Sequence, residues 1–235
     1  MVALKIASDF DPTDIISGSD GVDFYAVSKF DKDPAVLKGG GLQKEIDIWK
    51  RMQREWVSAA PNAKRHYIPG NHENRLETYL WRHPEMYDLE VLKLKNLLGL
   101  SDVGIGDPVE EVSFGEEKKL VIKHGEVVRK GSAMSAKGEL EKEFHSVSIM
   151  TGHTHRGGSY FATGRNGVVF AHECFCLCSL NPNYMKNPNW QQGFSIATVT
   201  KDTISIESIP IFTARGKKIA RWRGKEYTSG GIDNG

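Results

Sequence analysis

Apolar residues recur along the chain with two different periods. Between residues 42 and 60 they return every three or four positions, at Leu42, Ile46, Trp49, Met52 and Trp56. This spacing predicts an amphipathic helix. Segments 73–82, 89–100 and 134–144 have the same period and predict further helices, and His83-Pro84 separates the first two of them.

Shorter apolar runs predict β-strands. Before residue 158 they alternate with the helices, at 15–19, 65–68, 109–114, 119–125 and 146–150. After residue 158 they come in two pairs with a turn inside each pair, at 159–164 with 167–172 and at 194–200 with 203–212. The pattern predicts an α/β fold in which a two-layered sheet core carries helices on its outer faces.

Composition narrows the class of protein. A length of 235 residues fits a single domain spanning 1–235, with a basic tail from about residue 214. The net charge of +1 gives no overall field for nucleic acid or an acidic membrane surface. No run approaches the roughly 18 apolar residues of a membrane span, and the first residues, MVALKIASDFDP, lack the features of a signal peptide. We therefore expect a soluble cytoplasmic protein with no membrane partner.

The three cysteines fall within one short segment, HECFCLCSL, at Cys174, Cys176 and Cys178. An odd number of cysteines without a signal peptide argues against a disulfide framework. Alternate spacing on a strand would place all three thiols on one face, where they could bind a soft metal. Zinc sites usually draw ligands from separated segments, however. Small buried side chains on a strand are therefore the favoured interpretation.

Four predicted strands are each followed at once by residues that can bind a metal. These residues are Asp20, then Asn71 and His72, then His124, then His153 and His155. Each alone has an ordinary explanation, as a turn former or as a surface or hydrogen-bonded histidine. In open α/β sheets, however, sites form beyond the carboxyl ends of the strands. Four strands that deliver Asp, Asn and His to one edge predict a shared metal site.

The series Asp, Gly-Asn-His-Glu, His-Gly and Gly-His-Thr-His resembles the calcineurin-like metallophosphoesterase family over about residues 10–160. The segment HECFCLCSLNPNYMKNPNWQQGF is similar to the phage-type branch of that family, whose members act in the cytosol of a phage host or bacterium. The resemblance implies a four-layer α/β/β/α sandwich with two divalent metals at one sheet edge. It also implies a phosphatase or phosphodiesterase that uses a metal-activated water.

Carried over to matching positions, the resemblance implies that Asp20 bridges the two metal ions. Asn71, His124 and His153 would complete the site of one ion, and His155 would bind the other. Neutral imidazoles and a carboxylate suit Mn, Fe, Zn or Ni better than Mg or Ca.

The resemblance also implies a role for one residue at the phosphoester substrate, and two arginines beside the motifs are further candidates. His72 would stand near the substrate phosphate as a proton donor or charge stabiliser. Arg75 and Arg156 are candidates to hold phosphate oxygens, with a solvated surface residue as the ordinary explanation for each.

The sequence departs from the family pattern at its start. The family opens with Asp-x-His on its first strand, whereas the early counterpart here is Asp9-Phe10-Asp11. Asp9 and Asp20 are eleven positions apart, and the strand before Asp20 takes up some of that length. The remainder is too short for a crossover between parallel strands, which needs about a dozen residues. SDFDPTD is therefore predicted to be a helix end and a turn, and the family's N-terminal strand is expected to be missing.

The missing motif leaves the two predicted metal sites unequal. One site keeps its full set of ligands around His153, and the other, at His155, lacks two of them. We therefore expect one retained ion. Ser19, in place of the family's glycine before Asp20, is a second departure, since glycine allows close backbone approach there.

Three functions remain open from the sequence. The first is a metal-dependent phosphoester hydrolase, impaired by loss of the first motif. The second is a non-catalytic relative that keeps the fold and a single metal. The third is nucleic-acid binding by ARGKKIARWRGK (214–225), where six basic residues surround Trp222. The ordinary explanation for that segment is a solvated basic edge.

Overall fold

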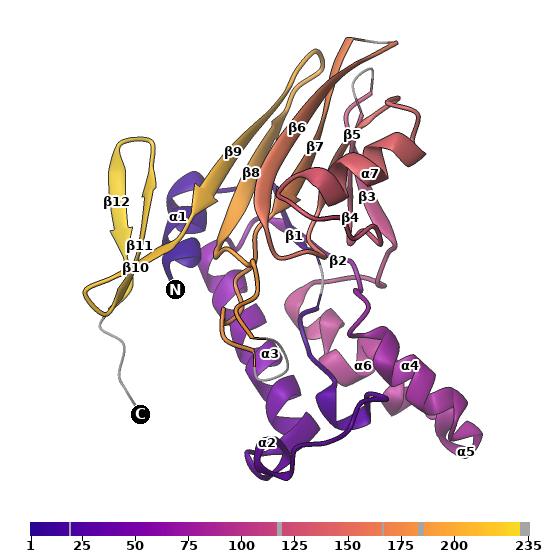
Figure 1. Cartoon of the computed structure of the whole chain (residues 1–235). Coiled ribbons are helices and arrows are strands. Elements are labelled where there is room, and N and C mark those ends of the chain that lie inside the picture. Colours follow the sequence, from indigo (N-terminus) through magenta and orange to yellow (C-terminus); the bar gives the residue numbers. More distant parts are fainter. Residues whose placement is uncertain (19, 117–118, 166, 183–185, 231–235) are drawn as a thin grey trace. The chain divides into compact units, whose positions relative to one another are not determined.

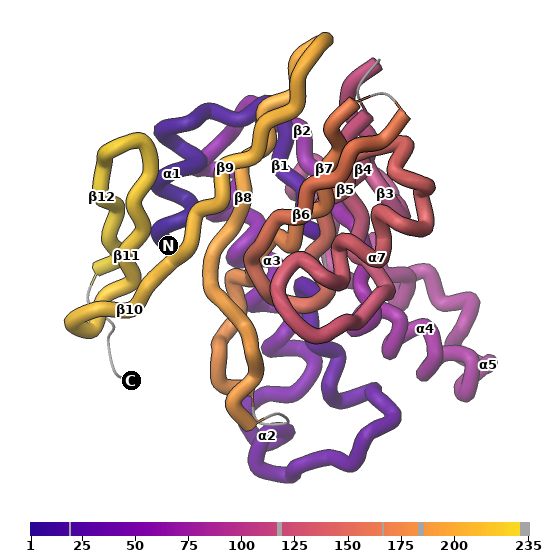
Figure 2. The backbone as a smooth tube through the Cα atoms, turned by 45° about the horizontal axis from the view of Figure 1, so that its top comes forward, coloured from indigo at the N-terminus to yellow at the C-terminus, as the bar shows by residue number. Residues whose placement is uncertain are grey.

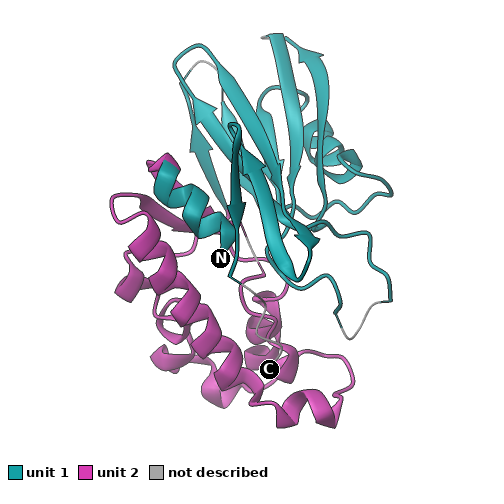
Figure 3. Cartoon of the chain, turned by 90° about the vertical axis from the view of Figure 1, so that its left-hand side faces the viewer, with its two compact units in different colours: residues 1–9, 111–235 teal, residues 10–110 magenta. Residues whose placement is uncertain are grey.

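A computed structural model describes residues 1–18, 20–116, 119–165, 167–182 and 186–230, and Figures 1 and 2 trace it from two directions. The chain forms two compact units, coloured separately in Figure 3. We call residues 10–110 the helical unit, and residues 1–9 with 111–235 the β-rich unit. The predicted Ser19 departure lies outside the described residues. The single-domain organisation stays a prediction.

The helical unit contains two parallel strands, β1 (Asp14–Ser17) and β2 (Lys64–Tyr67). Its other elements are η1 (Tyr25–Val27), α2 (Pro34–Lys38), α3 (Gly41–Ala59), α4 (Asn74–Trp81), α5 (Pro84–Tyr87), η2 (Glu90–Leu92), α6 (Leu94–Leu98) and η3 (Leu100–Val103). The predicted helices at 42–60 and 73–82 are confirmed as α3 and α4. The predicted helix at 89–100 is divided into η2, α6 and the start of η3, with Gly99 in the left-handed conformation between the last two (φ 61°).

The core of the helical unit forms where α3 meets β2. Ile46 and Trp49 lie on the buried face of α3, and the Trp49 ring packs edge-on against Tyr67 at a centroid distance of 5.1 Å. A Cβ atom at Gly21 would lie 2.5 Å from the Trp49 ring, so the turn after β1 needs glycine there. Trp49, one of the apolar residues that predicted α3, therefore also restricts the backbone at Gly21, next to Asp20.

The β-rich unit is built on a five-stranded mixed sheet in the order β3-β4-β5-β7-β6. Its strands are β3 (Glu111–Phe114), β4 (Leu120–Lys123), β5 (Ser148–Thr151), β6 (Gly157–Gly164) and β7 (Gly167–Cys174). β4, β5 and β7 run parallel, and β3 and β6 pair antiparallel at the two edges. Helix α7 (Met134–Lys142) packs on this sheet through Ala136 and Leu140 (Figure 1). The strands and the helix predicted between residues 109 and 172 are confirmed.

Two further sheets complete the β-rich unit. The hairpin of β8 (Gly193–Val199) and β9 (Ile204–Pro210) lies alongside β6 and β7 in both views (Figures 1 and 2). A small antiparallel sheet contains β10 (Phe212–Ala214), β11 (Lys217–Trp222) and β12 (Lys225–Thr228). The α/β class is thus confirmed, whereas the four-layer arrangement and the missing strand stay predictions. No helix among the described residues is long and apolar enough to cross a membrane.

Helix α1 (Val2–Phe10) packs against the C-terminal sheet. Lys5 donates to the carbonyl of Thr228 at 2.7 Å, and the Asp9 carboxylate accepts from Lys225 and from the Tyr227 hydroxyl. Because α1 ends at Phe10 and β1 begins at Asp14, the prediction that SDFDPTD is a helix end and a turn is confirmed. The structure gives the Asp9 carboxylate a role in joining two segments of the β-rich unit.

The basic segment 214–225 contains all of β11 and the turn after it. Trp222 is buried, and its indole nitrogen donates to Glu207 at 2.9 Å. Arg223 also pairs with Glu207, and Arg221 pairs with Glu226. The aromatic ring therefore serves the packing of the hairpin, and nucleic-acid binding by this segment stays a prediction.

His172 of β7 is a fully buried histidine that joins the two main sheets. Its ring nitrogens lie 2.8 Å from the Ser159 hydroxyl on β6 and 2.6 Å from the Ser195 hydroxyl on β8. Burial lowers the pKa of His172 from 6.5 to about 4, because a charged ring would lose its hydration there.

This pKa predicts how the stability of the protein depends on pH. Between pH 6.5 and 4 the unfolded chain binds a proton at His172 that the folded chain does not, so stability falls as the pH falls through this window. The loss amounts to about 3 kcal/mol at most. Urea unfolding of the native protein and of His172→Gln at several pH values should show a smaller pH slope for the variant. Equal slopes would contradict the prediction.

Candidate metal and phosphate site

His124 and His153 follow neighbouring parallel strands of the main sheet. β4 and β5 pair in register from Leu120 opposite Ser148 to Lys123 opposite Thr151. The backbone N–H groups of Gly152 and His153 both donate to the His124 carbonyl at 3.1 Å. The two rings meet edge to face, with His153 Nδ1 2.9 Å from His124 Nε2. The predicted pair is therefore brought together by strand pairing and by the turn that follows it.

The loop after His124 is anchored by a buried carboxylate on α7. Glu139 accepts from the backbone N–H groups of Glu126 and Val127 at 2.7 Å each, and Lys123 lies 3.2 Å from its second oxygen. Gly125 takes a positive φ of 90° to turn the chain toward this carboxylate. Burial acts to raise the pKa of Glu139, but the two backbone hydrogen bonds and the Lys123 charge together outweigh it and lower that pKa.

A second buried carboxylate, Glu173 of β7, holds the start of α7. It accepts from the backbone N–H groups of Ala133 at 2.9 Å and Ser135 at 3.1 Å, which replaces the side-chain cap that α7 lacks. Arg156 is also buried, and its guanidinium lies 3.4 Å from Glu173 and donates to the Ser135 hydroxyl and the Arg129 carbonyl. The structure thus gives Arg156 an internal role beside His155, and phosphate binding by Arg156 stays a prediction.

Asp20, Asn71 and His72 follow the two strands of the helical unit. Asp20 has a left-handed backbone (φ 48°), and its carboxylate accepts from the backbone N–H of His72 at 3.1 Å. Asn71 is exposed. The predicted residues after β1 and after β2 therefore meet, with Asp20 holding the turn that carries His72.

His72 and Arg75 share one carboxylate, that of Asp23. His72 Nδ1 lies 2.8 Å from Asp23, and Arg75 donates to both the carboxylate and the carbonyl of the same residue. Burial acts to raise the pKa of Asp23, but the hydrogen bond from His72 and the charges of His72 and Arg75 outweigh it, so the pKa lies below its usual value. Asp23 was not predicted from the sequence, although it lies only three positions after Asp20.

A third buried carboxylate, Glu73, binds backbone N–H groups in the loop after β1 and in the loop after β2. It accepts from the Gly70 N–H at 2.7 Å, the Tyr67 hydroxyl at 2.6 Å and the Val22 N–H at 3.3 Å. Burial and the negative charge of Glu73 raise the pKa of Tyr67 well above its usual value, so the hydroxyl remains a donor. The glutamate of the Gly-Asn-His-Glu motif thus ties the loop after β1 to the loop after β2.

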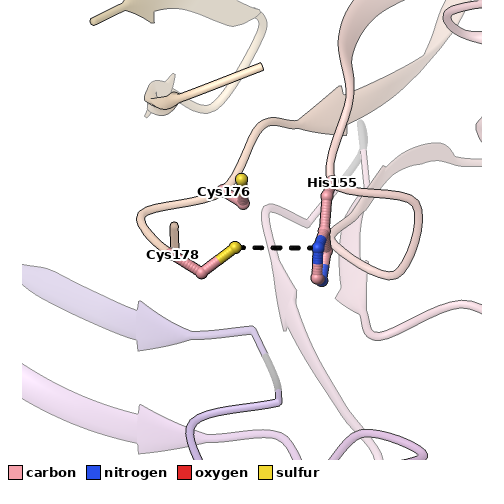
Figure 4. Close-up of side chains that lie close together, drawn as sticks. All are labelled: His155, Cys176 and Cys178. Carbon is pink, nitrogen blue, oxygen red and sulfur yellow. Dashed lines mark hydrogen bonds between the residues drawn. The ribbon is translucent and has the colours of Figure 1, made fainter. Parts of the chain in front are cut away.

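His155 lies beside two of the three cysteines (Figure 4). Its Nδ1 atom is 3.8 Å from the Cys178 sulfur, and the three ligand atoms of His155, Cys176 and Cys178 lie within 4.8 Å of one another. The hydrogen bond from Cys176, together with His155, lowers the pKa of the Cys178 thiol to about 5, although burial acts in the opposite direction.

The prediction that all three cysteines lie on one strand is wrong. β7 ends at Cys174, and Phe175 takes a left-handed conformation (φ 65°) that turns the chain out of the sheet. Cys178 is exposed and Cys176 is half-buried, so neither is a small buried side chain of a strand. Alternate spacing gave no signal for this turn, because a left-handed non-glycine residue is uncommon.

The predicted site residues therefore form local groups in each unit. His124 with His153, and His155 with two cysteines, belong to the β-rich unit, whereas Asp20, Asn71, His72 and Arg75 belong to the helical unit. These side chains include imidazoles, thiols and a carboxylate, which are common metal ligands in proteins. A single ion bound by Asp20, Asn71, His124 and His153 stays a prediction.

Comparisons with known proteins found likeness in structure but none in sequence. No protein-family model matches the sequence, and no curated protein matches it. Among solved structures, a Vps29 single mutant from Entamoeba histolytica is similar over 75% of this chain and 74% of that chain, with 11% identity and a TM-score of 0.37. Because the identity and the TM-score are low, the function proposed below rests on the residues of this chain.

The anchoring of the His124 loop predicts the effect of one substitution. Glu139→Gln removes the charge that binds two backbone N–H groups and Lys123, so the free energy of unfolding at pH 7 should fall by about 1–3 kcal/mol. The folded-state pKa of Glu139 is lowered, so this contribution is present above the ordinary glutamate pKa and is lost as the pH falls through the folded value. Denaturant unfolding at pH 7 measures it.

The more exposed Glu141 on the same helix provides the control. It pairs with Arg129 at the surface, and Glu141→Gln should change the free energy of unfolding by about 0.5 kcal/mol or less. Similar losses in the two variants would mean that the loop does not depend on Glu139.

Proposed function

We propose that the protein is a metal-dependent phosphoester hydrolase. The observation that carries the proposal is the His124–His153 pair. The two residues follow the ends of adjacent parallel strands, and a nitrogen of one ring lies 2.9 Å from a nitrogen of the other. Two nitrogens that each lie about 2.05 Å from one ion are roughly 2.9 Å apart at a right angle and roughly 3.3 Å apart at the tetrahedral angle. The pair therefore fits neighbouring positions around a single transition-metal ion.

Asp20 and Asn71 are the further ligands in this proposal. Their support is the order of motifs along the chain, with each residue following a strand of a parallel pair as His124 and His153 do. A set of two imidazoles, a carboxylate and an amide suits Mn, Fe, Zn or Ni. When bound, such an ion polarises a phosphoryl oxygen and lowers the pKa of water.

His72 is the proton donor in the proposed reaction. Its Nδ1 atom is held by Asp23 at 2.8 Å, which fixes the orientation of the ring. The opposite nitrogen, Nε2, is then the atom that can donate a proton to the leaving-group oxygen of the ester. Nε2 lies 4.0 Å from Asp20, so the donor and a predicted ligand belong to the same small group.

Arg75 supplies positive charge next to this histidine. Its contacts with the carboxylate and carbonyl of Asp23 limit the movement of the guanidinium. A guanidinium presents five donors, so those not used by Asp23 can bind phosphate oxygens. Asp23 would thus orient both a proton donor and a phosphate-binding group.

Separate roles for His124 and His72 predict separate outcomes. His124→Gln should remove the ion held with His153, lowering the metal content and abolishing turnover together. His72→Gln should keep the native metal content and lower turnover by roughly 10²–10⁴-fold, since only the proton transfer is lost. Elemental analysis after purification without chelators measures the first effect. Hydrolysis of an aryl phosphate monoester and diester with added Mn²⁺ measures the second.

His83→Gln, at a histidine stacked on Tyr79, is the matched control and should change neither quantity. Loss of metal in His72→Gln as in His124→Gln would overturn the assignment of roles. Native protein that binds the ion but turns over neither ester would indicate a non-catalytic, metal-binding relative instead.

A further inference from the structure

A group of soft metal ligands lies apart from the pair formed by His124 and His153. It consists of His155, from the turn after β5, with Cys176 and Cys178, from the segment after β7. Two sulfurs and one imidazole nitrogen within 4.8 Å of one another draw on two separated segments of the chain. That arrangement is typical of zinc ligands in proteins and differs from three thiols along a single strand.

The distance between Cys178 and His155 fits tetrahedral zinc. With Zn–S of about 2.3 Å and Zn–N of about 2.05 Å, a sulfur and a nitrogen on one ion are roughly 3.6 Å apart. The distance from Cys178 Sγ to His155 Nδ1 is 3.8 Å. A shift of a few tenths of an ångström in this distance is within the reach of side-chain rotation, and the pairs that involve Cys176 lie within 4.8 Å.

The backbone around the group is held by hydrogen bonds that do not involve the ligand atoms. The Gln191 N–H donates to the His155 carbonyl at 2.9 Å, and the Cys176 N–H donates to the Gln191 carbonyl at 3.1 Å. The Gln192 side chain donates to the Cys178 carbonyl at 2.6 Å. The segment 191–192 therefore bridges the two stretches of the chain that carry the ligands.

The His155 ring is also fixed on one side by packing. The Trp190 ring lies edge to face against it, with a centroid distance of 4.4 Å. An aromatic neighbour of this kind limits rotation of the imidazole and excludes water from that side. The chain thus positions His155 through both its backbone and its ring.

We propose that His155, Cys176 and Cys178 form a zinc site with three protein ligands and a fourth position open to water or another small ligand. Two thiolates and an imidazole select zinc over the harder ions that suit carboxylate and amide ligands. The site goes beyond the proposed hydrolase and does not depend on it. It gives His155 two partners from the cysteine segment.

Cobalt substitution tests the site directly. Only thiolate ligands give the intense sulfur-to-cobalt charge-transfer band in the near ultraviolet, so nitrogen and oxygen ligands at the hydrolase site contribute nothing to it. Native protein stripped of metal under reducing conditions and loaded with Co²⁺ should show this band. Stoichiometric Zn²⁺ should then remove it by displacing cobalt.

Cys174 offers a matched control for the thiol variants. Cys176→Ser and Cys178→Ser should each lose the band and lower the zinc content by one ion per chain. Cys174→Ser removes a thiol from the end of β7, outside the group, and should keep both. Zinc-edge X-ray absorption of the native protein should show two sulfur neighbours, which checks the site without any variant.

Three outcomes would overturn the proposal. One is the absence of the charge-transfer band in reduced, cobalt-loaded native protein, and another is its equal loss in Cys174→Ser. The third is a zinc-edge spectrum with only nitrogen and oxygen neighbours. His124→Gln separates the two metal proposals, since it should keep the band while losing phosphoester hydrolysis.

Discussion

Buried carboxylates that bind backbone N–H groups hold several of the loops around the residues of the proposed hydrolase site. Glu73 does this in the helical unit, and Glu139 and Glu173 do it in the β-rich unit. Each carboxylate is almost fully shielded from water, so its desolvation cost must be offset by hydrogen bonds. A hydrogen bond to a charged group contributes about 1.5–3 kcal/mol, and two or three of them provide that offset. If one of these carboxylates lost its charge, the loop N–H groups would keep only a weaker, neutral acceptor.

This constraint explains how the predicted ligands can lie on loops that are nevertheless held in a fixed conformation by side chains. Loops normally carry function on a rigid scaffold, and here the scaffold extends into the loops through side chains. Asp23 has a similar role closer to the chemistry, since it orients both His72 and Arg75. The strand before a histidine determines its approximate position, and the buried glutamate that binds the following turn determines the conformation of that turn.

Local patterns predicted most of the secondary structure, because apolar period and turn residues act over short distances. The helix at 42–60 and the hairpins after residue 158 were visible for this reason. The pairing of His124 with His153 was also predictable, since both follow apolar strands and such strand ends meet at one edge. The anchoring glutamates were not predicted, because their partners are backbone groups up to 51 positions away. The Cys176 and Cys178 arrangement was missed because a single left-handed residue, Phe175, breaks the alternation of the strand.

The contact of α1 with the C-terminal sheet has a consequence for folding. Asp9 and Lys225 are 216 positions apart, and the whole helical unit is inserted between the two segments of the β-rich unit. Contacts of such long range are slow to form, because the entropy of closing the chain is lost before the contacts can compensate for it. During synthesis, residues 10–110 can form their core around Trp49 before the C-terminal sheet that contacts α1 has been synthesised. Synthesis therefore delays the packing of α1, because α1 emerges long before the segment that it contacts.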